Sequence, residues 1–489
     1  MYKLDKLPFS NRFAQLPAHF YARVRPTPLD HARLFSFNPA AAQLINLDPT
    51  EVQNPEFASY FNGERAWQGT QTISALYAGH QFGSYVQQLG DGRAILLGES
   101  QGWELQLKGS GPTPFSRGSD GRAVIRSTVR EYLCSEAMHG LGIPTTRALC
   151  MLVSDEEVYR ERIEQGALLV RMAPSFIRFG SFEVFFHRRQ YEQLRQLADF
   201  VLANYFPELQ MQADPYLALL ETVVKRTARL MAQWQCVGFA HGVMNTDNMS
   251  ILGLTLDYGP FGFLDVYDPQ FICNHTDTSG RYAFDQQPSV GLWNLNALAH
   301  AFLPLLAEDP DEAVEKARSA LLQYQPEFDQ AWLSGMRAKL GLQQASDADE
   351  LLIADLLIKM QQNLVDYSIF FRRLAKLSSQ PSQADQVVRD LFLDRSAFDV
   401  WVEHYRQRLV QEGLVDADRQ IRMNQVNPAY ILRNYLAQAA IEQAEAGDAS
   451  EVELLLKLLQ DPFTEQAGME RYADHPPAWA DQISVSCSS

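Results

Sequence analysis

The spacing of apolar and polar residues divides the chain into a β-rich part followed by a longer helical part. Residues 103–108 alternate apolar and polar side chains, which predicts a strand paired in a hairpin with the apolar run just before it. Apolar residues then recur at helical spacing from about 122 to 139. The strands predicted in this part are 94–99, 103–108, 145–153 and 167–172.

Helical periodicity dominates the chain from residue 293 to about 459. The last long helix is predicted to start at Asn427-Pro428, because proline is tolerated in the first turn of a helix. With a short helix expected before the hairpin, the predicted helices are 72–80, 122–139, 188–205, 213–236, 293–306, 311–324, 350–377 and 429–446.

Composition and charge narrow the class of protein. The fractions of hydrophobic (46%) and charged (21%) residues are those of a globular protein, and no stretch approaches 18 consecutive apolar residues. The formal net charge of −17 disfavours nucleic acid and anionic membranes as partners. The N-terminal residues lack the apolar core of a signal peptide. We therefore expect a cytoplasmic protein, and the charge favours a monomer.

A polar cluster at 245–248, followed by an apolar run and then Asp257-Tyr258-Gly259, is the chemical centre of the sequence. Asn248 and Asp257 offer an amide oxygen and a carboxylate, which are hard ligands suited to magnesium. The alternative is a plain hairpin in which Asn and Asp side chains form Asx-turns. The residues alone leave both interpretations open.

The same stretch resembles the catalytic loop of protein kinases. His241 and Asn248 have the seven-residue separation of the kinase His and metal-binding Asn, and Asp257-Tyr258-Gly259 resembles the Asp-Phe-Gly motif. The position of the kinase catalytic aspartate is Val243, which cannot accept a proton. The resemblance therefore implies a kinase-like fold that keeps its metal ligands and has lost the usual base.

Lys108 ends its predicted strand, where kinases keep the lysine that holds ATP phosphates. In kinases a glutamate on the next helix pairs with this lysine. Glu131 is the more central of the two glutamates of that helix here, so the resemblance implies that it, and not Glu136, pairs with Lys108. The alternatives are a surface lysine and a solvated helix-face glutamate.

Other candidates for anion binding are glycines and arginines. Gly90, Gly92 and Arg93 could approach a phosphate, although the default interpretation of this turn is an Asp-Gly hairpin without a ligand. Arg171 and Arg178 lie near aromatic residues and form a plausible local anion site in an acidic chain; the alternative is solvated or salt-bridged arginines.

The motifs together resemble the selenoprotein O family, called YdiU in bacteria. The resemblance covers the chain from about residue 70 to its end, and its motifs are highly specific. The matching stretches are QLGDGR at 88–93, LQLKGSG at 105–111, SRGSDGRA at 116–123, HGVMNTDN at 241–248, DYGPFGFLD at 257–265 and NPAYILRN at 427–434.

The resemblance implies a two-lobed, protein-kinase-like α+β fold that transfers AMP from ATP to Ser, Thr or Tyr hydroxyls of proteins, with the nucleotide reversed relative to kinases. It implies an N-terminal extension at 1–70, a β-rich N-lobe with one key helix at 71–180, a helical C-lobe at 181–460 and a C-terminal tail at 461–489.

The resemblance also implies a role for each matching residue. Asp247 becomes the base, Asn248 and Asp257 the ligands of Mg²⁺ or Mn²⁺, and Glu131 the residue that orients Lys108. The implied nucleotide contacts are Gly90, Gly92, Arg93, Lys108, Asp120, Gly121, Arg171 and Arg178.

Five cysteines in 489 residues are too few for a disulfide framework. Cys487 occupies the place where eukaryotic members of the family carry selenocysteine. We hypothesise a reversible disulfide between Cys487 and Cys273, which lies in a segment resembling an activation loop; an ordinary tail thiol is the alternative.

Two further functions compete with AMP transfer. One is a true protein kinase, and the other is an inactive pseudokinase that binds nucleotide and scaffolds a redox partner. Retention of Lys108, Asn248 and Asp257 together disfavours the scaffold. Protein substrates, including thiol-redox proteins as candidates, are the expected partners.

Overall fold

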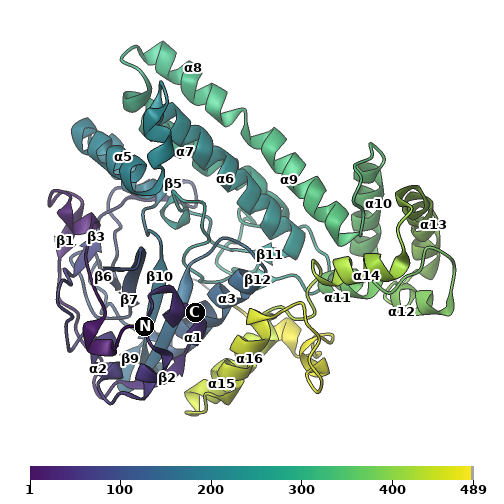
Figure 1. Cartoon of the computed structure of the whole chain (residues 1–489), viewed down its shortest axis with the longest axis horizontal. Coiled ribbons are helices and arrows are strands. Elements are labelled where there is room, and N and C mark those ends of the chain that lie inside the picture. The colour runs from purple at the N-terminus through teal and green to yellow at the C-terminus, as the bar shows by residue number, and fades with distance from the viewer. Residues whose placement is uncertain (486–489) are drawn as a thin grey trace.

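A computed structural model describes residues 1–485 of the chain. Its main sheet runs in the order β1-β3-β6-β7-β10-β9-β2, with β8 paired to β10, and these strands pair antiparallel. The sheet lies beside a large helical region (Figure 1). Its strands are β1 (Tyr21–Arg23), β2 (Arg33–Phe37), β3 (Ile73–Ala75), β6 (Ala94–Ser100), β7 (Trp103–Lys108), β8 (Ala123–Val124), β9 (Arg147–Tyr159) and β10 (Ile163–Ala173).

The predicted hairpin is confirmed, because β6 and β7 pair with Ala94 opposite Lys108. The predicted helix at 72–80 is wrong. Its residues form β3 and then β4 (Gly79–Gln81), which pairs with β5 (Ser84–Val86). β3 is held between β1 and β6, so pairing with distant strands overrides the local preference.

The first 70 residues supply part of the core on one face of the sheet. They contribute β1 and β2, which lie at the two ends of the strand order. Trp67 is buried and donates its indole N–H to the carbonyl oxygen of Leu4 (2.7 Å), and both residues join a cluster with Leu105 and Leu107 of β7. This segment therefore buries the face of β7 opposite to Gln106 and Lys108.

The helix α3 (Ile125–Gly140) packs on β9 and β10 and also contacts α15 and α16, which Figure 1 shows beside it. The long helices α6 to α9 lie together across the top of Figure 1. The helices are α1 (Pro39–Leu44), α2 (Phe57–Phe61), α3, α4 (Phe179–His187), α5 (Tyr191–Tyr205), α6 (Pro215–Val237), α7 (Gln287–Leu306), α8 (Pro310–Leu321), α9 (Tyr324–Lys339), α10 (Asp349–Gln362), α11 (Tyr367–Leu374), α12 (Gln386–Arg389), α13 (Arg395–Glu412), α14 (Asp416–Asn424), α15 (Asn434–Glu445) and α16 (Ser450–Gln460).

Two predicted helices have different bounds in the structure. The segment 350–377 is divided into α10 and α11, because Asp366 caps the second helix by accepting from the backbone N–H of Ile369 (2.9 Å). The helix predicted from Asn427-Pro428 starts only at Asn434. The side-chain amide of Asn427 instead donates to the carbonyl of Lys339 (2.9 Å), which holds this segment out of the helix. Among the helices within residues 1–485, none has both the length and the apolar character needed to cross a bilayer.

Buried Glu104 on β7 gives the fold a measurable pH dependence. Its carboxylate accepts from the backbone N–H of Phe176 (2.9 Å), and burial raises its pKa to about 8. Because this pKa lies above that of the unfolded chain, the folded state holds the proton more tightly. Stability is therefore lost as pH rises from about 4.5 through about 8.

We expect Glu104→Gln to remove this loss, since glutamine carries no charge. The difference in free energy of unfolding between the variant and the unaltered protein should rise between pH 5 and 8, by up to about 1.4 kcal/mol per pH unit. Melting temperatures measured across this pH range follow the change. Exposed Glu157→Gln on β9 is the matched control. If the melting temperatures of Glu104→Gln and the unaltered protein change with pH in the same way across this range, the raised pKa of Glu104 is contradicted.

Candidate active site

A cavity of about 710 Å³ lies where the sheet meets the loop that follows α6. The strands β11 (Phe239–Ala240) and β12 (Gly262–Phe263) pair antiparallel and hold the two ends of that loop together. The predicted site residues that line the cavity are Gly90, Gly92, Arg93, Lys108, Asp120, Glu131, Arg171, Asp247, Asn248 and Asp257. Gly121 and Arg178 are not among the lining residues.

Asp257 is the electrostatic centre of the site. One carboxylate oxygen accepts from Arg171 and lies 3.3 Å from the Lys108 ammonium, and the other accepts from Arg178. Burial by itself raises the pKa of Asp257, but the three cations lower it well below its usual range. The carboxylate is therefore ionised whenever the protein is folded near neutral pH.

Glu131 on α3 completes this network. Its carboxylate accepts from Lys108 and from Arg171, the latter at 2.8 Å. Burial lowers the pKa of Lys108, and Glu131 opposes that effect. With Arg178, the structure thus brings five predicted residues into one contact network.

The backbone at Asp257 has a φ of 57°, in the left-handed region that few residues other than glycine adopt. This conformation costs about 1 kcal/mol. The ion pairs of Asp257 fix its side chain in this position, so the strain is retained at the centre of the site.

Asp247 faces the cavity from the loop after α6 and is 8% exposed. One carboxylate oxygen accepts from the Gln81 amide (3.3 Å), and the other has no hydrogen-bond partner within residues 1–485. Burial raises the pKa of Asp247 to about 6, although Arg178 opposes the shift. Val243 also lines the cavity and offers no proton acceptor, so Asp247 is the carboxylate of this loop that can take a proton.

The donor set fits a hard divalent cation. The Asn248 side-chain N–H donates to the carbonyl of Val243 (3.0 Å), which leaves its amide oxygen available as a ligand. Asp257 is ionised and lines the same cavity, and Asp247 has an oxygen without a partner. Since the three cations partly neutralise Asp257, phosphate oxygens would have to complete the shell of a bound Mg²⁺ or Mn²⁺.

The glycines of the 88–93 turn have a packing role. A side chain on Gly90, whose φ is +85°, would come 2.5 Å from the ring of Phe115, and one on Gly92 would come 2.9 Å from the Phe115 carbonyl oxygen. Arg93 is exposed at the cavity, and within the described residues no ion pair holds it. The turn therefore presents a cation with room to contact an anion.

Asp120 and Gly121 are held by the structure of their own loop. Asp120 forms an ion pair with Arg160 (2.7 Å) and accepts from the backbone N–H of Arg122 (2.9 Å), and the contact with Arg160 chiefly lowers its pKa. A side chain on Gly121 would lie 2.1 Å from the carbonyl oxygen of Gly111. Asp120 lines the cavity, whereas Gly121 packs against the backbone of Gly111 in the same loop.

Sequence reasoning missed two polar residues of the site, Asp91 and Gln106. Asp91 is buried, accepts from the Gln106 amide (3.0 Å), and has its pKa raised by burial. The Gln106 oxygen in turn accepts from Arg171 (2.7 Å). The signal for Gln106 was its place on the same strand face as Lys108, and the signal for Asp91 was its position between Gly90 and Gly92.

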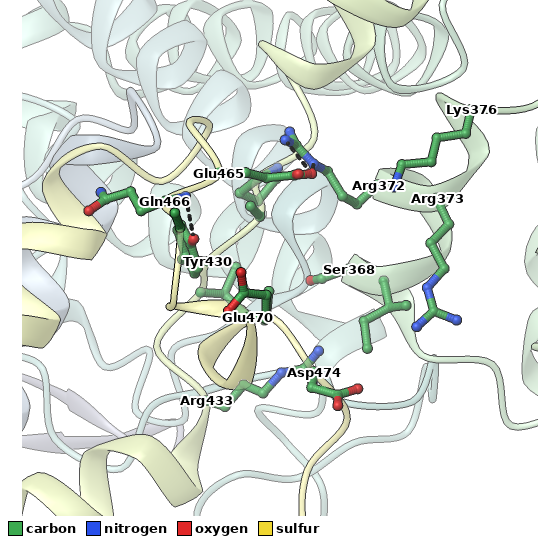
Figure 2. A pocket seen from close by; sticks show the side chains of 16 residues that line it. Ser368, Arg372, Arg373, Lys376, Tyr430, Arg433, Glu465, Gln466, Glu470 and Asp474 are labelled. Atoms are coloured by element: carbon green, nitrogen blue, oxygen red, sulfur yellow. Dashed lines mark hydrogen bonds and ion pairs between the residues drawn. The ribbon is translucent and has the colours of Figure 1, made fainter. Parts of the chain in front are cut away.

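A second hollow of about 590 Å³ lies near the C-terminal helices (Figure 2). Figure 2 shows Arg372 facing Glu465 in this hollow, at 3.0 Å. Arg433, which also lines the hollow, pairs with Asp366 at 2.9 Å. Residues 428–431 and Arg433 of the NPAYILRN stretch line this hollow and do not line the larger cavity. That stretch therefore does not contact the proposed nucleotide site.

The chain is similar in sequence to known proteins along its whole length. The sequence pattern of the family described as protein adenylyltransferase SelO matches residues 3–460. The chain belongs to the SelO family. It is 55% identical over 494 residues to protein nucleotidyltransferase YdiU of Myxococcus xanthus, 56% identical over 495 residues to that of Thiobacillus denitrificans, and 57% identical over 494 residues to that of Thioalkalivibrio sulfidiphilus. Each match covers 100% of both chains.

Membership in the SelO family confirms the resemblance drawn from the motifs. It does not test the disulfide hypothesis. Cys273 is buried, and its thiol donates to the carbonyl of Ala240 (3.5 Å). The tail reaches this segment, because the backbone N–H of His275 donates to the carbonyl of Val485 (3.0 Å). Cys487 lies outside the described residues, so its pairing stays a prediction.

The two glutamates of α3 have different partners, which yields a test. Glu131 binds Lys108 and Arg171, whereas buried Glu136 binds Arg147 through two contacts of 2.8 Å. Glu131→Gln removes the charge that binds Lys108 and Arg171, so we expect kcat/KM to fall roughly 10- to 100-fold. Because this ion pair is also buried, we expect a loss of stability comparable to that of the control variant.

Glu136→Gln is the matched control on the same helix. It breaks a buried ion pair, so we expect it to destabilise the protein by roughly 3–5 kcal/mol. The two variants are compared by thermal melting and by steady-state kinetics below the lower melting temperature. The assignment fails if Glu131→Gln keeps full kcat/KM there.

Proposed function

We propose that this chain transfers AMP from ATP to Ser, Thr or Tyr hydroxyls of other proteins and releases pyrophosphate. Its membership in the protein adenylyltransferase SelO family supports this reaction. The observation that carries the proposal is the joint placement of a cationic centre and Asp247 in one cavity, with valine at the kinase base position.

The cationic groups suit the pyrophosphate that leaves. Three cations bind Asp257, two of them also bind Glu131, and Arg93 adds a fourth at the cavity. Buried cations stabilise charge that develops on a leaving group without reorganising at the moment of reaction. We assign nucleotide contacts to Gly90, Gly92, Arg93, Lys108 and Arg171. For Arg178, Asp120 and Gly121 the contacts support an indirect role, through Asp257 and the loop wall.

Asp247 is proposed as the base for the acceptor hydroxyl. It would take the hydroxyl proton as the oxygen attacks the α-phosphorus, and the bond from that phosphorus to the bridging oxygen of pyrophosphate breaks. Asn248 and Asp257 would hold a divalent cation, which supplies charge neutralisation at the phosphates when bound.

We further propose that the sheet region at 71–180 and the helical region at 181–460 are the two lobes of a kinase-like fold. The cavity between β7, β10 and the loop after α6 supports this division. The contact of Lys108 with Glu131 matches the strand–helix ion pair of kinases.

ATP labelled separately at the α- and γ-phosphates tests the reaction. The purified chain is incubated with each label, Mg²⁺ or Mn²⁺ and acceptor proteins, including thiol-redox proteins. We expect protein labelling from the α-phosphate alone. Labelling from the γ-phosphate would mean a protein kinase, and labelling from neither would favour a nucleotide-binding scaffold.

The role of Asp247 is tested by Asp247→Asn. The variant keeps size and hydrogen bonding but removes the proton acceptor, so we expect kcat to fall roughly 10²- to 10⁴-fold. Because Asp247 is a buried carboxylate with one oxygen unpartnered in the described chain, we expect no loss of melting temperature. Full α-label transfer by Asp247→Asn would rule out this base.

Metal dependence is tested by removing divalent cations with a chelator. We expect α-label transfer to stop and to return when Mg²⁺ or Mn²⁺ is restored. Asp257→Ala should not respond to restoration, because it lacks the ionised ligand. Transfer that continues in the chelated protein would contradict the metal-assisted mechanism.

A further inference from the structure

Three metal-ligating side chains gather outside the nucleotide cavity. They are His80 on β4 and Glu183 and His187 on α4, and one ligand atom from each lies within 4.8 Å of the other two. Glu183 and His187 are four residues apart, which places them on one face of the helix. None of the three lines the nucleotide cavity.

The environment of the Glu183 carboxylate indicates a binding site for a cation. Its side chain is 1% exposed, and one oxygen contacts the His80 ring nitrogen at 2.5 Å. The second oxygen is buried and has no hydrogen-bond partner among residues 1–485. A buried carboxylate oxygen without a partner is costly, and a cation placed between the three side chains would satisfy it.

The surroundings of the cluster suit a metal ion that enters from solvent. The Tyr85 ring lies 3.9 Å from the His187 ring, and the Trp293 ring lies 5.3 Å from the His80 ring, measured between centroids. These aromatic walls exclude water from part of the cluster. His187 is exposed, so it can rotate and leave an entry path.

We propose that His80, Glu183 and His187 bind one divalent transition-metal ion of the zinc class. Two imidazoles and one carboxylate are a ligand set that such ions favour, whereas Mg²⁺ prefers oxygen alone. Ligand bonds of about 2.0–2.1 Å place donor atoms roughly 3.3 Å apart. Binding must therefore release the proton shared between His80 and Glu183, which lie 2.5 Å apart, and bring His187 closer to them. Water would fill the fourth position.

The site is connected to the proposed base through β4. The backbone N–H of His80 donates to the Thr246 hydroxyl (2.7 Å), and the next residue, Gln81, donates to Asp247 (3.3 Å). A bound ion would fix β4 to α4 and so fix Gln81 at Asp247. This consequence rests on the proposed function, whereas ion binding itself does not.

The test uses the full chain after treatment with a chelator, in the absence of ATP. Co²⁺ is added stepwise to the protein in a large excess of Mg²⁺, which occupies the all-oxygen site at Asn248 and Asp257. The visible absorption of Co²⁺ then reports ligation by imidazole. We expect the protein to bind one equivalent of Co²⁺ and Zn²⁺ to displace it. His187→Ala and Glu183→Gln should each weaken Co²⁺ binding on the order of 10- to 100-fold or more.

Exposed His404→Ala on α13 is the matched control and should bind Co²⁺ like the unaltered protein. Since His187 is exposed, His187→Ala should fold even if Glu183→Gln does not, and melting curves check both. Absence of imidazole-type absorption, or equal Co²⁺ affinity in His187→Ala and the unaltered protein, would overturn the proposal. Neither outcome depends on AMP transfer, so failure here is distinct from failure of the proposed function.

Discussion

The site depends on a single carboxylate, Asp257, that is shared by three cations. Lys108 comes from β7, Arg171 from β10 and Arg178 from the segment before α4, so the interaction joins the sheet to the loop after α6. Such buried charges are stable only when each has a partner, and Glu131 supplies the second carboxylate. Three cations against two carboxylates leave a positive centre, which suits a polyphosphate in an otherwise acidic protein.

The proposed base, Asp247, lies in the same loop as Asp257 and lines the same cavity. Because Val243 occupies the kinase base position and offers no proton acceptor, we propose Asp247, beside Asn248, for that role. Burial keeps its pKa near 6, so it is ionised at neutral pH yet holds a proton more readily than an ordinary aspartate. The β11–β12 pair holds the ends of its loop together, and Gln81 donates a hydrogen bond to its carboxylate.

Local patterns predicted the elements whose stability is local. The β6–β7 hairpin and α3 are confirmed, since strand alternation and helical spacing fixed them before any distant contact mattered. The helix predicted at 72–80 is wrong because β1 and β6 pair with that segment, and residues 427–433 are not helical because Asn427 contacts Lys339.

Only part of the site could be predicted from the sequence, because several of its contacts join residues that are far apart in the chain. Motif spacing indicated Lys108, Glu131 and Asp257, which the structure brings into contact. Asp91 was treated as part of a turn, and His80 as part of a helix. Their partners Gln106 and Glu183 lie 15 and 103 residues away, so no local pattern connects them.

The central claim is that a kinase-like pocket holds its nucleotide reversed, so that the innermost phosphate faces the acceptor. A structure of the chain with a non-hydrolysable ATP analogue and a divalent cation tests it most directly. We expect the α-phosphate beside Asp247 and the β- and γ-phosphates against Lys108 and Arg93. A complex with the γ-phosphate beside Asp247 would contradict the account.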